Sequence, residues 1–179
     1  MKQLKDISRD DLRELLGKGW LTHDGMWFYT VNSHLGTEAT SRLNKQAIKA
    51  MAPFEVQRLL RIMEMSKEDL KDTESVVQFM RNAMSLILPD SVVTTFHLEV
   101  KPAGSIRYRW QKNECFAYKG MSRIGVISKY ECGVMYRIEC WMRELGLQFK
   151  ANPELILCQM HETGCCEGEY LLSLNNNVS

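Results

Sequence analysis

The chain has 179 residues, of which 45% are apolar, and a formal net charge of +1. This length and apolar content suffice for one domain with a substantial core, residues 1–179, and no Pro-, Gly- or Ser-rich linker divides it. A net charge so close to zero gives no general electrostatic attraction to nucleic acid or to an acidic membrane surface, so neither is expected as a partner.

The N-terminus is charged from its second residue, and no apolar run approaches the roughly 18 residues that a membrane span requires. We therefore expect a cytoplasmic protein. Its six cysteines are then thiols in a reducing compartment, where clustered cysteines indicate a metal site or catalysis rather than disulfides.

Helical patterns fill the N-terminal part, residues 1–89. Ser8 followed by Asp11 is a variant of the capping box and predicts a short helix, which Gly17 and Gly19 should end. Three further helices are expected after it.

The second helix of the chain should cover residues 22–35 and end at Gly36. The third should cover residues 37–65, with a kink or a new start at Pro53. The fourth should begin at residue 73 and carry apolar residues at helical spacing as far as Pro89.

Strand patterns begin after these helices, in residues 90–174. Apolar and polar residues alternate over 91–100, which is the period of a half-buried strand, and a turn follows at 101–104. The next strand places Ile106, Tyr108 and Trp110 on one face.

The chain is then predicted to be helical over 115–146, with a break near 128–130. A second hairpin, with strands near 155–157 and 170–172, closes it. The predicted fold class is α+β: N-terminal helices followed by a hairpin, helices and a hairpin, with a small antiparallel sheet.

Three cysteines in the last third of the chain have the pattern Cys132-x25-Cys158-x7-Cys166. Cys132 stands at the start of a predicted helix, and the other two stand at the ends of a predicted hairpin turn. Three thiols converging in this way are typical of a tetrahedral metal site.

The same segment resembles the 4-vinyl reductase-like ligand-binding domain, which also forms the sensor half of bacterial phenol-responsive regulators and is related in fold to the TRAPP vesicle-tethering subunits. The residues that carry this resemblance are Tyr130, Glu131, Cys132, Gly133, Trp141, Gly146, Pro153, Cys158 and Cys166. It implies a TRAPP-like fold, zinc bound by the three cysteines, and pairing through helices into a homodimer.

In those sensors a glutamate three residues before the second cysteine completes the zinc site, and here that position is Leu155. The candidates for a fourth ligand are Cys115, Glu154, His161 and Cys165. The run from Trp20 to Phe28, together with Cys115, is also similar to an uncharacterised family of prokaryotic cytosolic proteins and to the thiazoline-carboxylate hydrolases.

A ligand pocket is expected between the sheet and the helices. Aromatic side chains with a polar edge commonly orient a ligand, and the predicted lining residues are His23, Trp27, Phe96, Tyr108 and Trp110. The ligand is expected to be apolar or aromatic, and an anionic group is an option because the charged residues between Lys101 and Lys129 are mostly basic.

Two function classes follow. The first is a small-molecule binding domain with a structural zinc site. The second is an enzyme, either a hydrolase with a cysteine nucleophile activated by His23 or His161, or a catalytic zinc site with an open fourth position.

An iron–sulfur cluster on Cys115, Cys132, Cys158 and Cys166 is a third option. The sequence has no Ser-His-Asp signature, glycine-rich phosphate loop or HExxH motif, so binding is preferred over catalysis.

Overall fold

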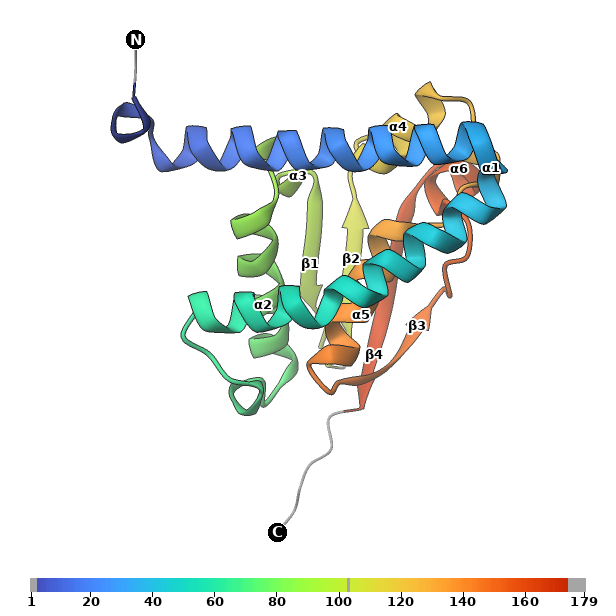
Figure 1. Cartoon of the computed structure of the whole chain (residues 1–179). Helices are drawn as coiled ribbons and strands as arrows, with labels where there is room; N and C mark the ends of the chain where they lie inside the picture. Colours follow the sequence, from blue (N-terminus) through green and yellow to red (C-terminus); the bar gives the residue numbers. More distant parts are fainter. Residues whose placement is uncertain (1–2, 103, 174–179) are drawn as a thin grey trace.

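The computed structural model describes residues 3–102 and 104–173 and has the α+β class that the sequence predicts (Figure 1). Long helices come first, and a four-stranded sheet with helices between its strands follows. The elements are η1 (Leu4–Asp6), α1 (Arg9–Ile62), η2 (Lys67–Asp69), α2 (Thr73–Ile87), α3 (Asp90–Val93), β1 (Phe96–Val100), β2 (Ile106–Trp110), α4 (Phe116–Arg123), η3 (Ile127–Lys129), α5 (Gly133–Glu144), β3 (Gln148–Asn152), α6 (Gln159–Thr163) and β4 (Cys166–Ser173).

Helix α1 consists of two limbs, residues 9–35 and 37–62, joined at Gly36. The backbone of Gly36 has φ 76° and ψ 168°, a conformation that favours glycine, and the chain turns back there (Figure 1). The predicted helix end at Gly36 is therefore confirmed. The predicted break at Pro53 is wrong, because the second limb passes through that residue without non-helical backbone.

The predicted helix end at Gly17 and Gly19 is also wrong, because the first limb continues through both. Gly17 faces Pro89, and a Cβ added to it would lie 2.9 Å from the Pro89 Cδ atom. This glycine allows the first limb to approach the segment after α2 closely. The helix begins as predicted, with the Ser8 hydroxyl accepting a hydrogen bond from the Asp11 backbone N–H at 3.0 Å.

The sheet has the strand order β1-β2-β4-β3, and every neighbouring pair is antiparallel. One face is buried and carries Phe96, Leu98, Ile106, Tyr108, Trp110, Cys166 and Tyr170. The other face is polar; the Arg107 guanidinium there donates to the Glu167 carboxylate at 2.9 Å. The alternation predicted for the first hairpin is thus confirmed over β1 and β2.

Two strand predictions are wrong in position. Residues 90–93 form the short helix α3, because Asp90 supplies an acidic first turn directly after Pro89, and β1 begins only at Phe96. The last hairpin uses residues 148–152 as its first strand instead of 155–157. Strand β3 lies at the sheet edge and has no buried residue; its five residues alternate polar and apolar, with Phe149 and Ala151 partly buried against the core.

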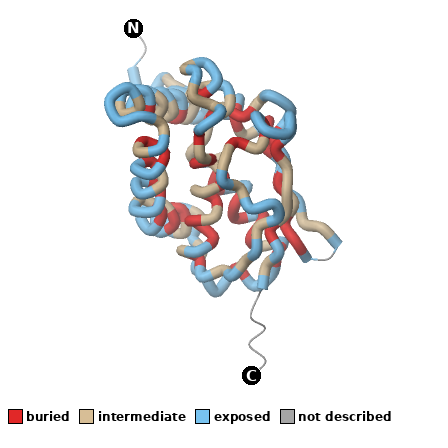
Figure 2. The backbone as a smooth tube through the Cα atoms, turned by 90° about the vertical axis from the view of Figure 1, so that its right-hand side faces the viewer, coloured by how far each residue is buried: buried red, intermediate tan, exposed pale blue. Residues whose placement is uncertain are grey.

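The helices cover the buried face of the sheet. Helix α5 packs along α1, and α2 packs beside β1 (Figure 1). Buried positions concentrate between these layers, and the outer sides of the helices are exposed (Figure 2). No helix in residues 3–102 or 104–173 is long and apolar enough to cross a membrane.

Candidate functional site

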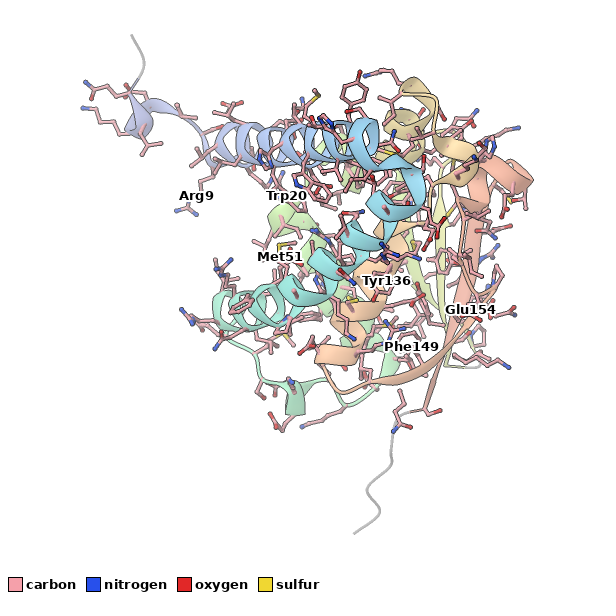
Figure 3. The ribbon with its side chains drawn as sticks, turned by 45° about the vertical axis from the view of Figure 1, so that its right-hand side comes forward. Arg9, Trp20, Met51, Tyr136, Phe149 and Glu154 are labelled. Atoms are coloured by element: carbon pink, nitrogen blue, oxygen red, sulfur yellow. The ribbon has the colours of Figure 1, made fainter. Side chains whose placement is uncertain are left out.

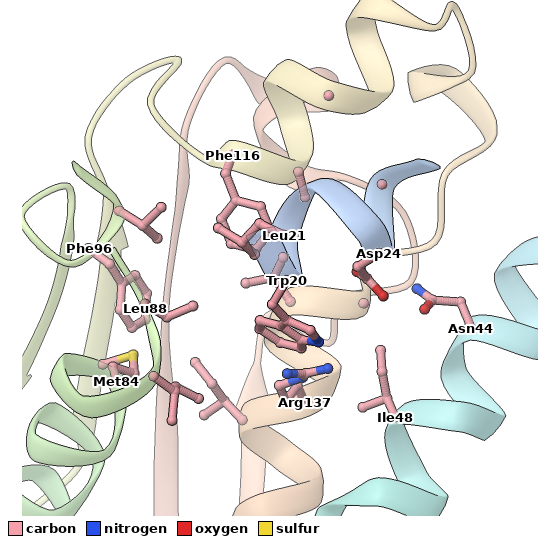
Figure 4. A pocket seen from close by; sticks show the side chains of 18 of the residues that line it. Trp20, Leu21, Asp24, Asn44, Ile48, Met84, Leu88, Phe96, Phe116 and Arg137 are labelled. Carbon is pink, nitrogen blue, oxygen red and sulfur yellow. The ribbon is translucent and has the colours of Figure 1, made fainter. Parts of the chain in front are cut away.

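A cavity of about 160 Å³ lies between the first limb of α1 and the sheet. Elements from most of the chain enclose it, namely both limbs of α1, the end of α2, α3, β1, β2, α4 and α5 (Figure 4). Its walls are mainly apolar. The lining residues are Trp20, Leu21, Asp24, Gly25, Phe28, Asn44, Ile48, Met84, Ile87, Leu88, Val92, Val93, Phe96, Trp110, Phe116, Ala117, Gly120, Met121, Tyr130, Gly133, Val134, Arg137, Ile138 and Trp141.

Three aromatic rings form one wall of this cavity. The ring centroids of Phe96 and Trp110 are 4.8 Å apart, and those of Trp110 and Phe116 are 6.1 Å apart with the rings edge to face. These separations are typical of favourable aromatic contacts. The wall therefore presents Trp110 in a fixed orientation.

The indole N–H of Trp110 is buried and donates no hydrogen bond to any described residue. A buried donor without an acceptor costs roughly 1–3 kcal/mol, so most native structures supply one. Trp110 is only 4% exposed and lines the cavity. An acceptor that approached this N–H from the cavity side would remove the cost.

Asp24, Asn44 and Arg137 make the cavity polar at one end (Figure 4). The Arg137 guanidinium pairs with the Glu55 carboxylate, with 3.2 Å between Nη1 and Oε1, and its central carbon lies 4.4 Å from the centroid of the Trp20 ring. Glu55 also accepts a hydrogen bond from a second α5 side chain, the indole N–H of Trp141, at 2.9 Å.

Burial raises the pKa of the Asp24 carboxyl, and the nearby charges of Arg137 and then His23 oppose that shift only in part. Asp24 accepts no side-chain hydrogen bond and forms no ion pair with the described residues. The polar end of the cavity therefore holds one carboxyl group without a partner.

Two of the five predicted ligand-binding residues, Phe96 and Trp110, line the cavity. Tyr108 lies on the same sheet face but is packed beside Tyr170, with 5.3 Å between the ring centroids, and does not reach it. His23 and Trp27 are exposed on the outer side of the first limb.

Sequence reasoning missed Trp20, Asp24 and Arg137. The first two are four residues apart, and Phe28 follows after four more, which is the spacing of one helix face. That signal becomes visible once the helix is continued through Gly17 and Gly19. The segment 101–129, whose basic residues suggested an anionic ligand, contributes no Lys or Arg to the cavity.

Four of the cysteines begin elements that meet at one end of the sheet. Cys115, Cys132 and Cys158 directly precede α4, α5 and α6, and Cys166 is the first residue of β4, opposite Trp110. All four are buried. Cys158 therefore starts a helix, and the prediction that it ends a hairpin strand is wrong.

Burial is the main influence on these thiols. It raises the pKa of Cys115 to about 12 and that of Cys132 to about 11, and it also raises the pKa of Cys158 and Cys166. The thiols also raise one another's pKa, so they share one neighbourhood. All four are neutral at pH 7.

The arrangement of these thiols does not fit a metal ion. Among residues 3–102 and 104–173, no group of three or more His, Cys, Asp or Glu side chains is placed so that it could hold one. The remaining candidate ligands, Glu154, His161 and Cys165, are exposed, and Glu154 lies beyond the end of β3 (Figure 3). Zinc binding by Cys132, Cys158 and Cys166 stays a prediction without geometric support.

Comparisons with known proteins give one relationship. No curated protein matches the chain, and no solved structure matches its fold. They provide no link to the 4-vinyl reductase-like domain. A family model described as "Family of unknown function (DUF6125)" matches residues 5–95, slightly more than half of the 179 residues, and the chain therefore belongs to that family.

Proposed function

We propose that this protein is a small-molecule binding domain whose cavity encloses a single small aromatic molecule. The observation that supports this most strongly is the buried indole N–H of Trp110, which has no acceptor among the described residues and belongs to a side chain of the otherwise apolar cavity wall. Apolar cavities with few polar groups are typical of ligand sites. The ligand should carry an oxygen or nitrogen that accepts from this N–H.

The volume of the cavity limits the ligand. Its 160 Å³ is close to the roughly 150 Å³ of an engineered protein cavity that binds benzene. It is smaller than the roughly 300 Å³ at which pockets for drug-sized ligands begin. The ligand is therefore one aromatic ring with a short substituent, and long-chain acids are too large.

Binding is favoured over cysteine catalysis. A cysteine nucleophile requires a lowered pKa, and burial raises the pKa of Cys115 and of Cys132. His23 and His161, the candidate bases, are exposed. A cysteine hydrolase would need a thiol with a lowered pKa and a histidine base beside it.

The proposed ligand class agrees with the resemblance to phenol sensors, because phenol has the size that this cavity accepts. It also keeps a cytoplasmic homodimer and zinc as expectations. Elemental analysis of anaerobically purified protein tests the metal. About one zinc per chain would support the resemblance against the arrangement of the thiols, whereas colourless, metal-free protein in its folded state would exclude both zinc and an iron–sulfur cluster.

Calorimetric titration with p-cresol and toluene tests the binding function. These probes differ by one hydroxyl, so p-cresol should bind more tightly if its oxygen accepts from Trp110. Trp110→Phe keeps an aromatic ring but removes the donor, and should lower the affinity for p-cresol by roughly three- to tenfold while changing that for toluene little.

Trp27→Phe is the matched control, because Trp27 lies outside the cavity lining. It should leave both affinities unchanged. The proposal fails if neither probe binds the wild-type protein, measured by calorimetry and by ligand-observed NMR.

A further inference from the structure

The two charged residues of the cavity differ in how they are neutralised. Arg137 already has a carboxylate partner, because its Nη1 lies 3.2 Å from Oε1 of Glu55 and both side chains are 14% exposed. Its guanidinium also packs on the Trp20 ring. Its positive charge is thus partly offset within the protein.

Asp24 has no such partner. It lines the cavity, yet no described residue donates a side-chain hydrogen bond to its carboxylate or forms an ion pair with it. When it ionises, the cavity therefore carries one negative charge that no described side chain pairs with directly, and the charge of Arg137 offsets it only in part. Asp24 is half-buried, so its charge without a partner is partly desolvated at a cost, and a cationic ligand would supply the missing partner.

The surroundings of Asp24 suit a positively charged donor. Asn44 lies at the same end of the cavity, on the second limb of α1, and its amide oxygen is a second acceptor for an N–H (Figure 4). The other end is formed by apolar residues such as Leu88, Phe96 and Phe116. The cavity thus combines an aromatic compartment with an acceptor end.

From this juxtaposition we infer that the ligand is a small aromatic amine. Its ring lies against Phe96 and Trp110 and carries the oxygen that accepts from the Trp110 N–H, and its ammonium group donates to Asp24 and Asn44. This inference rests on the proposed binding function and specifies its ligand class. It replaces the earlier expectation of an anionic group.

The test compares three probes of nearly equal size, toluene, benzylamine and benzoate, by calorimetry at pH 7.5. Wild-type protein should bind benzylamine at least about tenfold more tightly than toluene, because hydrogen bonds to charged groups are among the stronger ones. Benzoate should bind more weakly than toluene, because Asp24 repels it.

Asp24→Asn keeps the shape and removes the charge. It should abolish the advantage of benzylamine over toluene. Glu38→Gln is the matched control, since Glu38 is an exposed acid on the same helix α1, outside the cavity lining; it should keep the full preference.

Two outcomes overturn the amine assignment while the binding function stands: benzylamine binding no tighter than toluene, or benzoate binding tighter than both. An equal loss of preference in the Asp24 and Glu38 variants also overturns it, because the cause is then the general surface charge. If none of the probes, p-cresol included, binds wild-type protein, the binding function itself fails. The wild-type comparison decides even if Asp24→Asn does not fold.

Discussion

Glu55 connects the second limb of α1 to α5 through two interactions, and its removal should be among the most destabilising single changes in this protein. Its carboxylate pairs with Arg137 at 3.2 Å and accepts from the indole N–H of Trp141 at 2.9 Å. The substitution Glu55→Ala leaves both groups of α5 without a partner in a largely buried setting.

The expected magnitude follows from these two losses. Breaking a buried ion pair from one side costs roughly 3–5 kcal/mol, and leaving a buried donor without an acceptor costs roughly 1–3 kcal/mol. The two terms share one carboxylate, and both side chains of the pair retain 14% exposure, so they do not add fully. We expect Glu55→Ala to lower the free energy of unfolding by about 3–4 kcal/mol, and the Tm by roughly 6–15 °C at this chain length.

Urea denaturation followed by circular dichroism measures this change. Glu55→Gln should cost about 1–2 kcal/mol, because the amide oxygen still accepts from Trp141 while the charge is lost. Lys18→Gln is the control, since it removes an exposed pair with Glu14 and should cost less than about 0.5 kcal/mol. A loss below about 1 kcal/mol for Glu55→Ala would refute the reasoning, because Arg137 and Trp141 would then be satisfied without Glu55.

Four further substitutions test other parts of the structure. Gly19→Ala should stabilise the protein by about 0.5–1 kcal/mol, because nothing lies within 4 Å of the added Cβ. Gly17→Ala should destabilise it by about 1–3 kcal/mol, because the added Cβ meets Pro89. Thermal melts that rank the two variants in the opposite order would contradict the packing of the first limb. Gly168→Ala should lower the free energy of unfolding by about 1–3 kcal/mol or more, as overpacking with backbone shifts does, because the added Cβ would lie 2.5 Å from the hydroxyl of Tyr108. A folded variant with unchanged Tm would contradict the register of β2 and β4. The pKa of the Asp24 carboxyl is raised in the folded state, so wild-type protein should lose stability relative to Asp24→Asn as the pH rises from the ordinary value of 3.8 through the folded pKa. Urea midpoints of the two proteins that run parallel from about pH 3.5 to 8 would contradict the burial of this carboxyl.

The sequence was informative where a side-chain period decides the outcome. Alternation over 106–110 correctly placed Trp110 and Tyr108 on the buried face, but alternation sets the face and not the position along it. The cavity lies at the Trp110 end of the hairpin, so Tyr108 fills core instead. The pairing of Arg137 with Glu55 joins residues 82 apart in sequence, and no local pattern reports such a contact.

Glycine was the other source of error. Sequence gives one signal for a glycine that ends a helix and for a glycine that lets another segment come close. Gly36 ends a limb, with φ 76°, whereas Gly17 is helical and contacts Pro89. Only the tertiary packing against residue 89 distinguishes the two, and this error hid the helix face that carries Trp20 and Asp24.

The division of the cavity walls has a consequence for how members of this family diverge. Half of the lining residues belong to the segment 5–95 that the family model matches, and half come from 96–141, outside it. Asp24 lies in the first half and Trp110 in the second. Substitutions within 96–141 would thus alter the aromatic wall without changing Asp24, so two proteins that share only the matched helical segment need not share a ligand.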